Sequence, residues 1–117
     1  MSPLLEHKKP ESHLNAEQKL LTVLVPGNLV STTVEALRNA VNSLLDWPAG
    51  QPVPWQTLKL DLTAARMVDS AGLNLVVAIL RAVRRVGGRM QVAYSDTNVH
   101  RTLVFTRLDR HVELIKA

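Results

Sequence analysis

Segments with strand patterns and segments with helix patterns alternate along this chain of 117 residues, and most of the connections between them are short. Alternation at this spacing is typical of a parallel sheet whose strands are linked by crossover helices. We therefore predict an α/β fold, with a compact, largely parallel sheet and helices packed against it. The predicted strands are 19–25, 57–62, 89–94 and 111–115, and the predicted helices are about 33–46, 70–86 and 97–107.

Local patterns support these boundaries. In TLKLDL (57–62) the leucines alternate with polar residues, so they share one face of a strand. Thr32 and Glu35 have the spacing of a capping box, which predicts the start of the first helix. Gly87 and Gly88 end the second helix, and Asp96 is positioned to cap the third.

Proline-rich segments divide the chain further. The stretch WPAGQPVPWQ (47–56) must be a loop, and we expect Trp47 and Trp55 at its ends to pack over the core rather than to bind a ligand. Residues 1–17 are polar and have mixed charge, so we predict a loose tail in which residues 10–17 supply at most a weak edge strand. The remainder, 18–117, is predicted to be one domain.

Composition excludes several classes of protein. No apolar run approaches the ~18 residues of a membrane span, and the N-terminus lacks a hydrophobic signal segment, so we expect a cytoplasmic protein without membrane partners. The chain has no cysteine, which rules out disulfides and thiolate metal sites. Its formal charge is +4, but the basic residues are dispersed and few aromatic residues are available for base stacking, so we predict no nucleic-acid partner.

The stretch MVDSAGLNLV (67–76) places an acid and a serine where the strand pattern gives way to the helix pattern. The simplest interpretation is that Asp69 and Ser70 start the helix, because both residue types are favoured N-caps. A hydrolase interpretation fails, because a nucleophile elbow needs glycine two residues before the serine, where Val68 stands. Neither a metal-ligand spacing nor a phosphate-binding loop is present, so we predict no enzyme activity, no metal and no cofactor.

A third interpretation is that Ser70 accepts a phosphate. The free amides and the dipole of a helix N-terminus favour an added anion, so the modification would not unfold the site. Asp69, together with Asp61 across the junction, would then lie near a new charge of about −2. This strongly negative region could repel a partner without any change of fold.

Helical periodicity divides the second helix into two sides. The predicted apolar side contains Leu73, Val76, Ile79, Leu80 and Val83, and the opposite side contains Ser70, Asn74, Val77, Ala78, Arg81, Arg84 and Arg85. Small residues near the serine would let another protein approach closely, which suits a docking surface better than a catalytic pocket. The predicted partner-binding residues are Asp61, Asp69, Ser70, Ala71, Gly72, Asn74, Val77, Arg81 and Arg84.

These motifs resemble the STAS domain of bacterial anti-sigma factor antagonists. The resemblance covers about residues 18–116, and it rests on Asp61, the run Asp69-Ser70-Ala71-Gly72-Leu73, the pair Gly87-Gly88 and the pair Leu108-Asp109. It implies a small, mostly parallel sheet of four to five strands with three to four helices packed on one side. It also implies that an anti-sigma factor with serine kinase activity phosphorylates Ser70.

The resemblance implies a cycle of binding and release. The unphosphorylated form binds the anti-sigma factor and frees a sigma factor, the phosphorylated form releases it, and a PP2C-type phosphatase resets the cycle. The alternative is a constitutive STAS scaffold of a stressosome-like or lipid-transport complex, in which Ser70 is only a cap. Two features depart from the family: Val30 replaces an acid of the turn after the early strand, and the first hairpin is hard to see. The sequence does not predict the oligomeric state.

Overall fold

One five-stranded sheet organises the residues that the computed structural model describes, which are 9–48 and 50–117. Its strands are β1 (Glu11–Asn15), β2 (Leu20–Leu24), β3 (Thr57–Leu62), β4 (Arg89–Tyr94) and β5 (Glu113–Lys116). They lie side by side in their order along the chain. β1 runs antiparallel to β2, and each later pair of neighbours is parallel. The predicted mostly parallel sheet is therefore confirmed.

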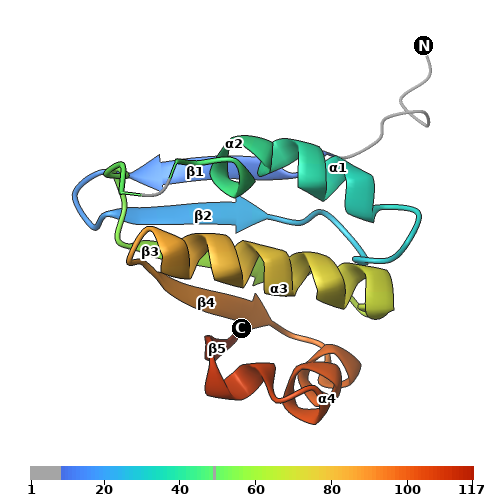
Figure 1. Ribbon diagram of the computed structural model, residues 1–117. Coiled ribbons are helices and arrows are strands. Elements are labelled where there is room, and N and C mark those ends of the chain that lie inside the picture. Colours follow the sequence, from blue (N-terminus) through green and yellow to red (C-terminus); the bar gives the residue numbers. More distant parts are fainter. Residues whose placement is uncertain (1–8, 49) are drawn as a thin grey trace.

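Helices cover one face of this sheet (Figure 1). They are α1 (Val34–Ala40), α2 (Asn42–Leu45), α3 (Ser70–Arg85), α4 (Thr97–Phe105) and the short 3₁₀ helix η2 (Leu108–Arg110). In Figure 1, α1 and α2 lie along the β1–β2 side, α3 crosses the middle of the sheet, and α4 lies beyond β4. The long helix α3 therefore occupies the centre of the helical layer.

The core lies between the sheet and the helices. Alternate strand positions point toward the helices, and their side chains align in rows across three parallel strands because the strands pair in register. Most of these side chains are fully buried, and burying one contributes about 1.5–3 kcal/mol to stability. The two central rows are Leu21–Leu58–Met90 and Val23–Leu60–Val92.

The N-terminal part of the sheet is a hairpin. β1 pairs with β2 from Glu11 opposite Leu24 to Asn15 opposite Leu20. The sheet thus begins before residue 18, where the predicted domain begins, and residues 1–8 of the predicted tail lie outside the described residues. Every residue of β1 is exposed, which explains why its sequence lacks the apolar alternation that marks a half-buried strand.

The first predicted helix, 33–46, is wrong in its continuity and in its cap. The structure has two helices, α1 and α2, separated at Val41, a β-branched residue between asparagine-containing turns of low helix propensity. The capping box of Thr32 and Glu35 does not form. Instead, the hydroxyl of Thr33 donates to the carbonyl of Asn28 at 2.7 Å and accepts from the Val30 amide at 3.0 Å.

From Trp55 onward, the structure agrees more closely with the predicted helices and strands. Asp96 caps α4 by accepting hydrogen bonds from the amides of Asn98 and Val99, and Trp55 is buried in the core as predicted. α3 ends at Arg85, and Gly87 follows it with a φ of 78°, a left-handed conformation that glycine adopts readily. The last strand begins at Glu113 rather than at residue 111, because η2 occupies the preceding turn.

Candidate functional site

The candidate site lies where the parallel strands end and α3 begins. Two loops meet there, the β2–α1 loop (residues 25–33) and the β3–α3 loop (residues 63–69). Both follow the carboxyl ends of adjacent parallel strands, which is where open α/β sheets commonly place their binding sites. Ser70 is the first residue of α3 and is exposed.

Backbone hydrogen bonds join the two loops into one unit. Leu29 and Val68 form an isolated parallel bridge. Around it, the Leu29 amide donates to the Met67 carbonyl at 3.1 Å, and the Asp69 amide donates to the Leu29 carbonyl at 3.2 Å. The position of the first turn of α3 is therefore fixed by a loop about forty residues earlier in the chain.

Asn28 strengthens this junction. Its Oδ1 atom accepts hydrogen bonds from the amides of Arg66 at 2.8 Å and Met67 at 3.1 Å. The sequence interpretation did not identify Asn28, although a Pro-Gly-Asn run is a strong turn signal. The neighbouring β4–α4 loop is also attached, because the Ser95 hydroxyl donates to the Thr63 carbonyl at 2.7 Å.

Asp69 is the N-cap of α3 and also a link between the loops. Its Oδ1 accepts from the Gly72 amide at 2.9 Å, and its Oδ2 accepts from the Ser31 amide at 2.9 Å. These two backbone donors, Gly72 first, lower the pKa of Asp69 below the ordinary aspartate value of 3.8. The carboxylate is therefore ionised at neutral pH, and both of its oxygens already have protein partners.

Gly72, which is one of the predicted partner-binding residues, is buried. A Cβ at this position would clash with the carbonyl oxygen of Leu29. The glycine thus permits α3 to approach the β2–α1 loop closely. Its role in the structure is to allow the close packing between α3 and the β2–α1 loop that forms the site.

Asp61 is also engaged locally. Its Oδ1 accepts from the Thr63 amide at 2.9 Å and from the Thr63 hydroxyl at 2.7 Å. It alternates with Leu60 and Leu62, which face the helices, so it lies on the other face of the strand. No hydrogen bond joins Asp61 to Asp69 or Ser70 in the part of the chain that the structure describes.

Along α3, the structure confirms most of the predicted division into two sides. Val76, Ile79, Leu80 and Val83 are buried, whereas Leu73 is only half-buried. Leu75 and Ala82 are buried as well, so the apolar side is wider than predicted. The remaining predicted partner-binding positions are exposed or half-buried: Ser70, Asn74, Arg81 and Arg84 are exposed, and Ala71 and Val77 are half-buried.

Val30 lies in the β2–α1 loop, at the position where the resemblance noted in the sequence predicts an acid. It is half-buried, and its carbonyl oxygen accepts hydrogen bonds from the amides of Thr33 at 2.9 Å and Val34 at 2.8 Å. The loop thus supplies the Ser31 amide to the site but no carboxylate. The sequence pattern predicts that Met67 and Val68 are both buried; Val68 is buried, but Met67 is 55% exposed next to the site.

The site has the character of a surface rather than of a catalytic pocket. Among residues 9–48 and 50–117, no group of three or more His, Cys, Asp or Glu side chains is arranged to hold a metal ion. Within the same described ranges, no helix combines the length and the apolar character that crossing a membrane requires. Hydroxyl, amide and guanidinium groups on an exposed helix face suit contacts with another protein.

Comparisons with known proteins agree with this description. The family model described as "STAS domain" matches residues 12–117. No curated protein matches the chain. Among solved structures, a candidate anti-sigma factor antagonist from Thermotoga maritima has a TM-score of 0.76 at 19% identity and covers 92% of this chain and 86% of that chain.

Two further solved structures share the fold. An anti-sigma factor antagonist from Mycobacterium paratuberculosis has a TM-score of 0.69 at 22% identity, covering 92% of this chain and 86% of that chain. The cell fate determinant SpoIIAA of Bacillus, in its phosphorylated form, has a TM-score of 0.66 at 17% identity, covering 92% and 90%. At these identities the likeness shows a common fold.

Proposed function

Since this chain belongs to the STAS domain family, we propose that it is an anti-sigma factor antagonist whose binding is switched by phosphorylation of Ser70. In the unphosphorylated state it binds an anti-sigma factor that is also a serine kinase, and in the phosphorylated state it releases that partner. The main support for this proposal is that Ser70 is exposed and is the first residue of α3, a helix whose N-terminus is capped by Asp69. No hydrogen bond engages its hydroxyl with the other described residues.

The local electrostatics suit such a switch. Transfer of the γ-phosphoryl group of ATP to the Ser70 oxygen, with loss of the hydroxyl proton, adds a charge of about −1.5 to −2. The N-terminal dipole of α3 favours an anion there, so the helix tolerates the change. Asp69 is already ionised beside it because its pKa is lowered. The surface thus becomes strongly negative while the fold stays intact.

The docking surface that we propose runs along the exposed side of α3 from Ser70 through Asn74 and Arg81 to Arg84, flanked by Ala71 and Val77. Gly72 and Asp69 hold this surface in place, through close packing and through capping. The role requires no catalysis by the chain itself, since the kinase is the partner and a PP2C-type phosphatase removes the phosphate. Support also comes from the phosphorylated form of a structural neighbour, SpoIIAA.

A phosphorylation assay with a serine kinase of the anti-sigma type tests the assignment of Ser70. We expect the kinase and ATP to add one phosphate to the wild type and to Ser31→Ala, but none to Ser70→Ala. Ser31 is the matched control because it is an exposed serine on the adjoining loop. Intact-protein mass spectrometry measures the result, and phosphorylation of Ser70→Ala as fast as wild type would show that the acceptor lies elsewhere.

Measurements of partner binding distinguish a phosphorylation switch from a constitutive scaffold. We expect Ser70→Asp to weaken binding to the anti-sigma factor at least about tenfold, which corresponds to about 1.4 kcal/mol. Isothermal titration calorimetry of wild type, Ser70→Ala and Ser70→Asp measures this difference. Equal affinities for all three proteins would favour a constitutive scaffold, in which Ser70 only begins the helix.

A further inference from the structure

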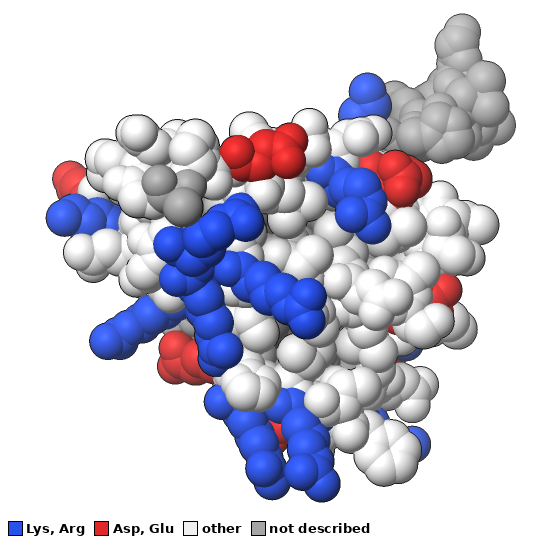
Figure 2. All heavy atoms as spheres, viewed as in Figure 1, with Lys and Arg blue, Asp and Glu red and all other residues white. Residues whose placement is uncertain are grey.

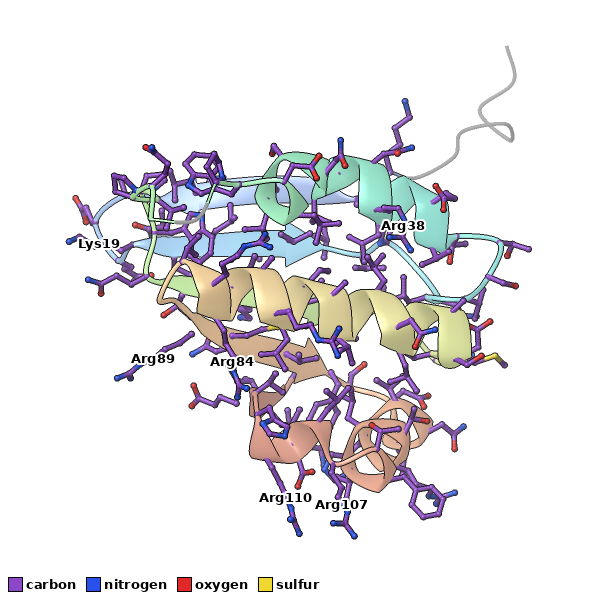
Figure 3. The ribbon with its side chains drawn as sticks, viewed as in Figure 1. Lys19, Arg38, Arg84, Arg89, Arg107 and Arg110 are labelled. Atoms are coloured by element: carbon purple, nitrogen blue, oxygen red, sulfur yellow. The ribbon has the colours of Figure 1, made fainter. Side chains whose placement is uncertain are left out.

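The end of the molecule opposite Ser70 carries a second candidate site. A groove with a volume of about 510 Å³ lies between the last turn of α3, the start of β4 and the segment that joins η2 to β5. The cationic side chains of Arg84, Arg89 and Arg110 line it, together with His111. Figure 3 shows these arginines at the C-terminal end of α3 and below it.

The positive charge at this end is concentrated. Figure 2 shows Lys and Arg side chains gathered over the C-terminal half of α3 and over the part of the molecule that contains η2. We call this region the arginine pole and define it as Arg81, Arg84, Arg85, Arg89, Arg107 and Arg110. Asp109 and Glu113 are the carboxylates of the same segments. The resulting excess of four positive charges equals the formal net charge of the whole chain.

These charges are not neutralised within the described part of the chain. Its salt bridge lies elsewhere, between Arg38 and Glu35 at 3.4 Å. At the groove, a guanidinium nitrogen of Arg84 lies 3.1 Å from the Nδ1 atom of His111, and Glu113 accepts a hydrogen bond from the side-chain amide of Gln91 at 2.8 Å. The guanidinium groups at the groove therefore remain available to anionic groups of another molecule.

The arrangement favours an extended anionic partner over a small ligand. In Figure 3, Arg89 extends away from the fold to the left, whereas Arg107 and Arg110 both extend downward, so the three side chains do not converge on one point. The apolar residues Leu80, Met90 and Val112 line the groove but are at least nine-tenths buried, so they offer little surface for a hydrophobic ligand. Guanidinium groups pair well with carboxylates through two parallel hydrogen bonds.

We propose that the arginine pole binds an acidic, carboxylate-rich segment of a partner protein. The arginine pole shares Arg81 and Arg84 with the far end of the docking surface proposed above, but it is distant from Ser70 itself. From Ser70 to Arg84 along α3 the distance is about 21 Å at 1.5 Å per residue, well beyond the Debye length of about 8 Å at physiological salt. In the free protein, charge at Ser70 is therefore screened from the arginine pole, and the proposal does not depend on the proposed switch. A partner that covers the whole exposed side of α3 would compete for Arg81 and Arg84.

A labelled oligoglutamate peptide is the probe for this site, and fluorescence anisotropy at physiological ionic strength is the measurement. We expect the wild type to bind it and the triple variant Arg84→Gln, Arg89→Gln, Arg110→Gln to bind at least about tenfold more weakly, because charge-assisted hydrogen bonds are lost. The matched control is Arg38→Gln, Arg101→Gln, Lys116→Gln, which removes the same charge from exposed positions elsewhere. We expect the control to change affinity by less than about twofold.

Several outcomes would overturn the proposal. Equal losses in the two triple variants would show a non-specific effect of net charge. Tighter binding of a short DNA duplex than of the peptide would assign the surface to nucleic acid. The Lys triple (Arg84→Lys, Arg89→Lys, Arg110→Lys) keeps the charge, and we expect it to retain more affinity than the Gln triple. Ser70→Asp should leave peptide affinity unchanged, and a loss there would contradict the independence of the two sites.

Discussion

Gly72 illustrates at the residue scale how the site depends on the absence of a side chain. Replacing it with alanine places a methyl group against the carbonyl oxygen of Leu29, a backbone atom that the Leu29–Val68 bridge holds in place. We expect Gly72→Ala to lower the free energy of unfolding by about 1–3 kcal/mol, as overpacking commonly does. Urea denaturation at neutral pH measures the change.

Gly27 is the matched control for this substitution. It lies in the β2–α1 loop, and a Cβ there would meet nothing within 4 Å. Gly27→Ala should therefore change the free energy of unfolding by less than about 0.5 kcal/mol. A similar loss in both variants would mean that the close approach of α3 to Leu29 is not the cause.

Asp69 makes the stability of the fold depend on pH, in a direction that follows from its hydrogen bonds. Because the amides of Gly72 and Ser31 lower its pKa in the folded state, the carboxylate stabilises the fold above the ordinary aspartate value of 3.8, and this contribution disappears as the pH falls through the lowered pKa. We expect Asp69→Asn to have a lower Tm than wild type at pH 7. The difference should shrink as the pH is lowered below 3.8.

Asp96→Asn is the comparison for Asp69→Asn. Asp96 caps α4 through one oxygen only, Oδ1, which the asparagine side chain also provides. Asp69 uses both oxygens, one for the Gly72 amide of α3 and the other for the Ser31 amide of the β2–α1 loop, and an asparagine NH₂ group cannot accept from Ser31. Thermal unfolding followed by circular dichroism should thus show the larger loss for Asp69→Asn at pH 7, and an equal loss would argue against the loop-linking role.

At the scale of elements, β1 protects an edge rather than filling the core. All of its residues are exposed, yet it pairs along the whole length of β2. An uncovered strand edge can pair with another molecule. We expect deletion of residues 1–15 to lower Tm by roughly 5 °C and to promote dimers or larger species, which size-exclusion chromatography with light scattering would detect.

The control for this deletion removes residues 1–8 and keeps β1 intact. The shorter deletion should behave like the full chain in the same chromatography. If both truncated proteins stay monomeric at every concentration tested, pairing of β1 with β2 does not serve to cover the edge. If both associate, the cause lies outside the hairpin.

At the scale of the whole molecule, the sequence predicts the elements better than the contacts between them. Strand 57–62 and the helix at 70–86 follow from local patterns, because leucine alternation and helical periodicity directly reflect which side is buried. β1 is not clearly predicted because all of its residues are exposed, so its sequence carries no apolar alternation. Val41 interrupts the first helix although the apolar periodicity continues through it.

The candidate site, like the fold, is only partly predictable from local sequence patterns. The cap at Asp69 and the exposure of Ser70 are local properties, and sequence reasoning finds them. The burial of Gly72 depends on Leu29, and the orientation of Asp61 depends on its strand face, so neither follows from the junction motif alone. Asn28 is recognisable as a turn residue, but its bonds to Arg66 and Met67 require the fold.

The order β1-β2-β3-β4-β5 has a consequence for how the protein is made. The ribosome releases the chain from its N-terminus. In this sheet order, each strand pairs with the strand that precedes it in the sequence, which has already left the ribosome. No gap between two existing strands has to be held open for a later one to enter. Biosynthesis can therefore extend the sheet in one direction, with the short strand β5 as the final addition.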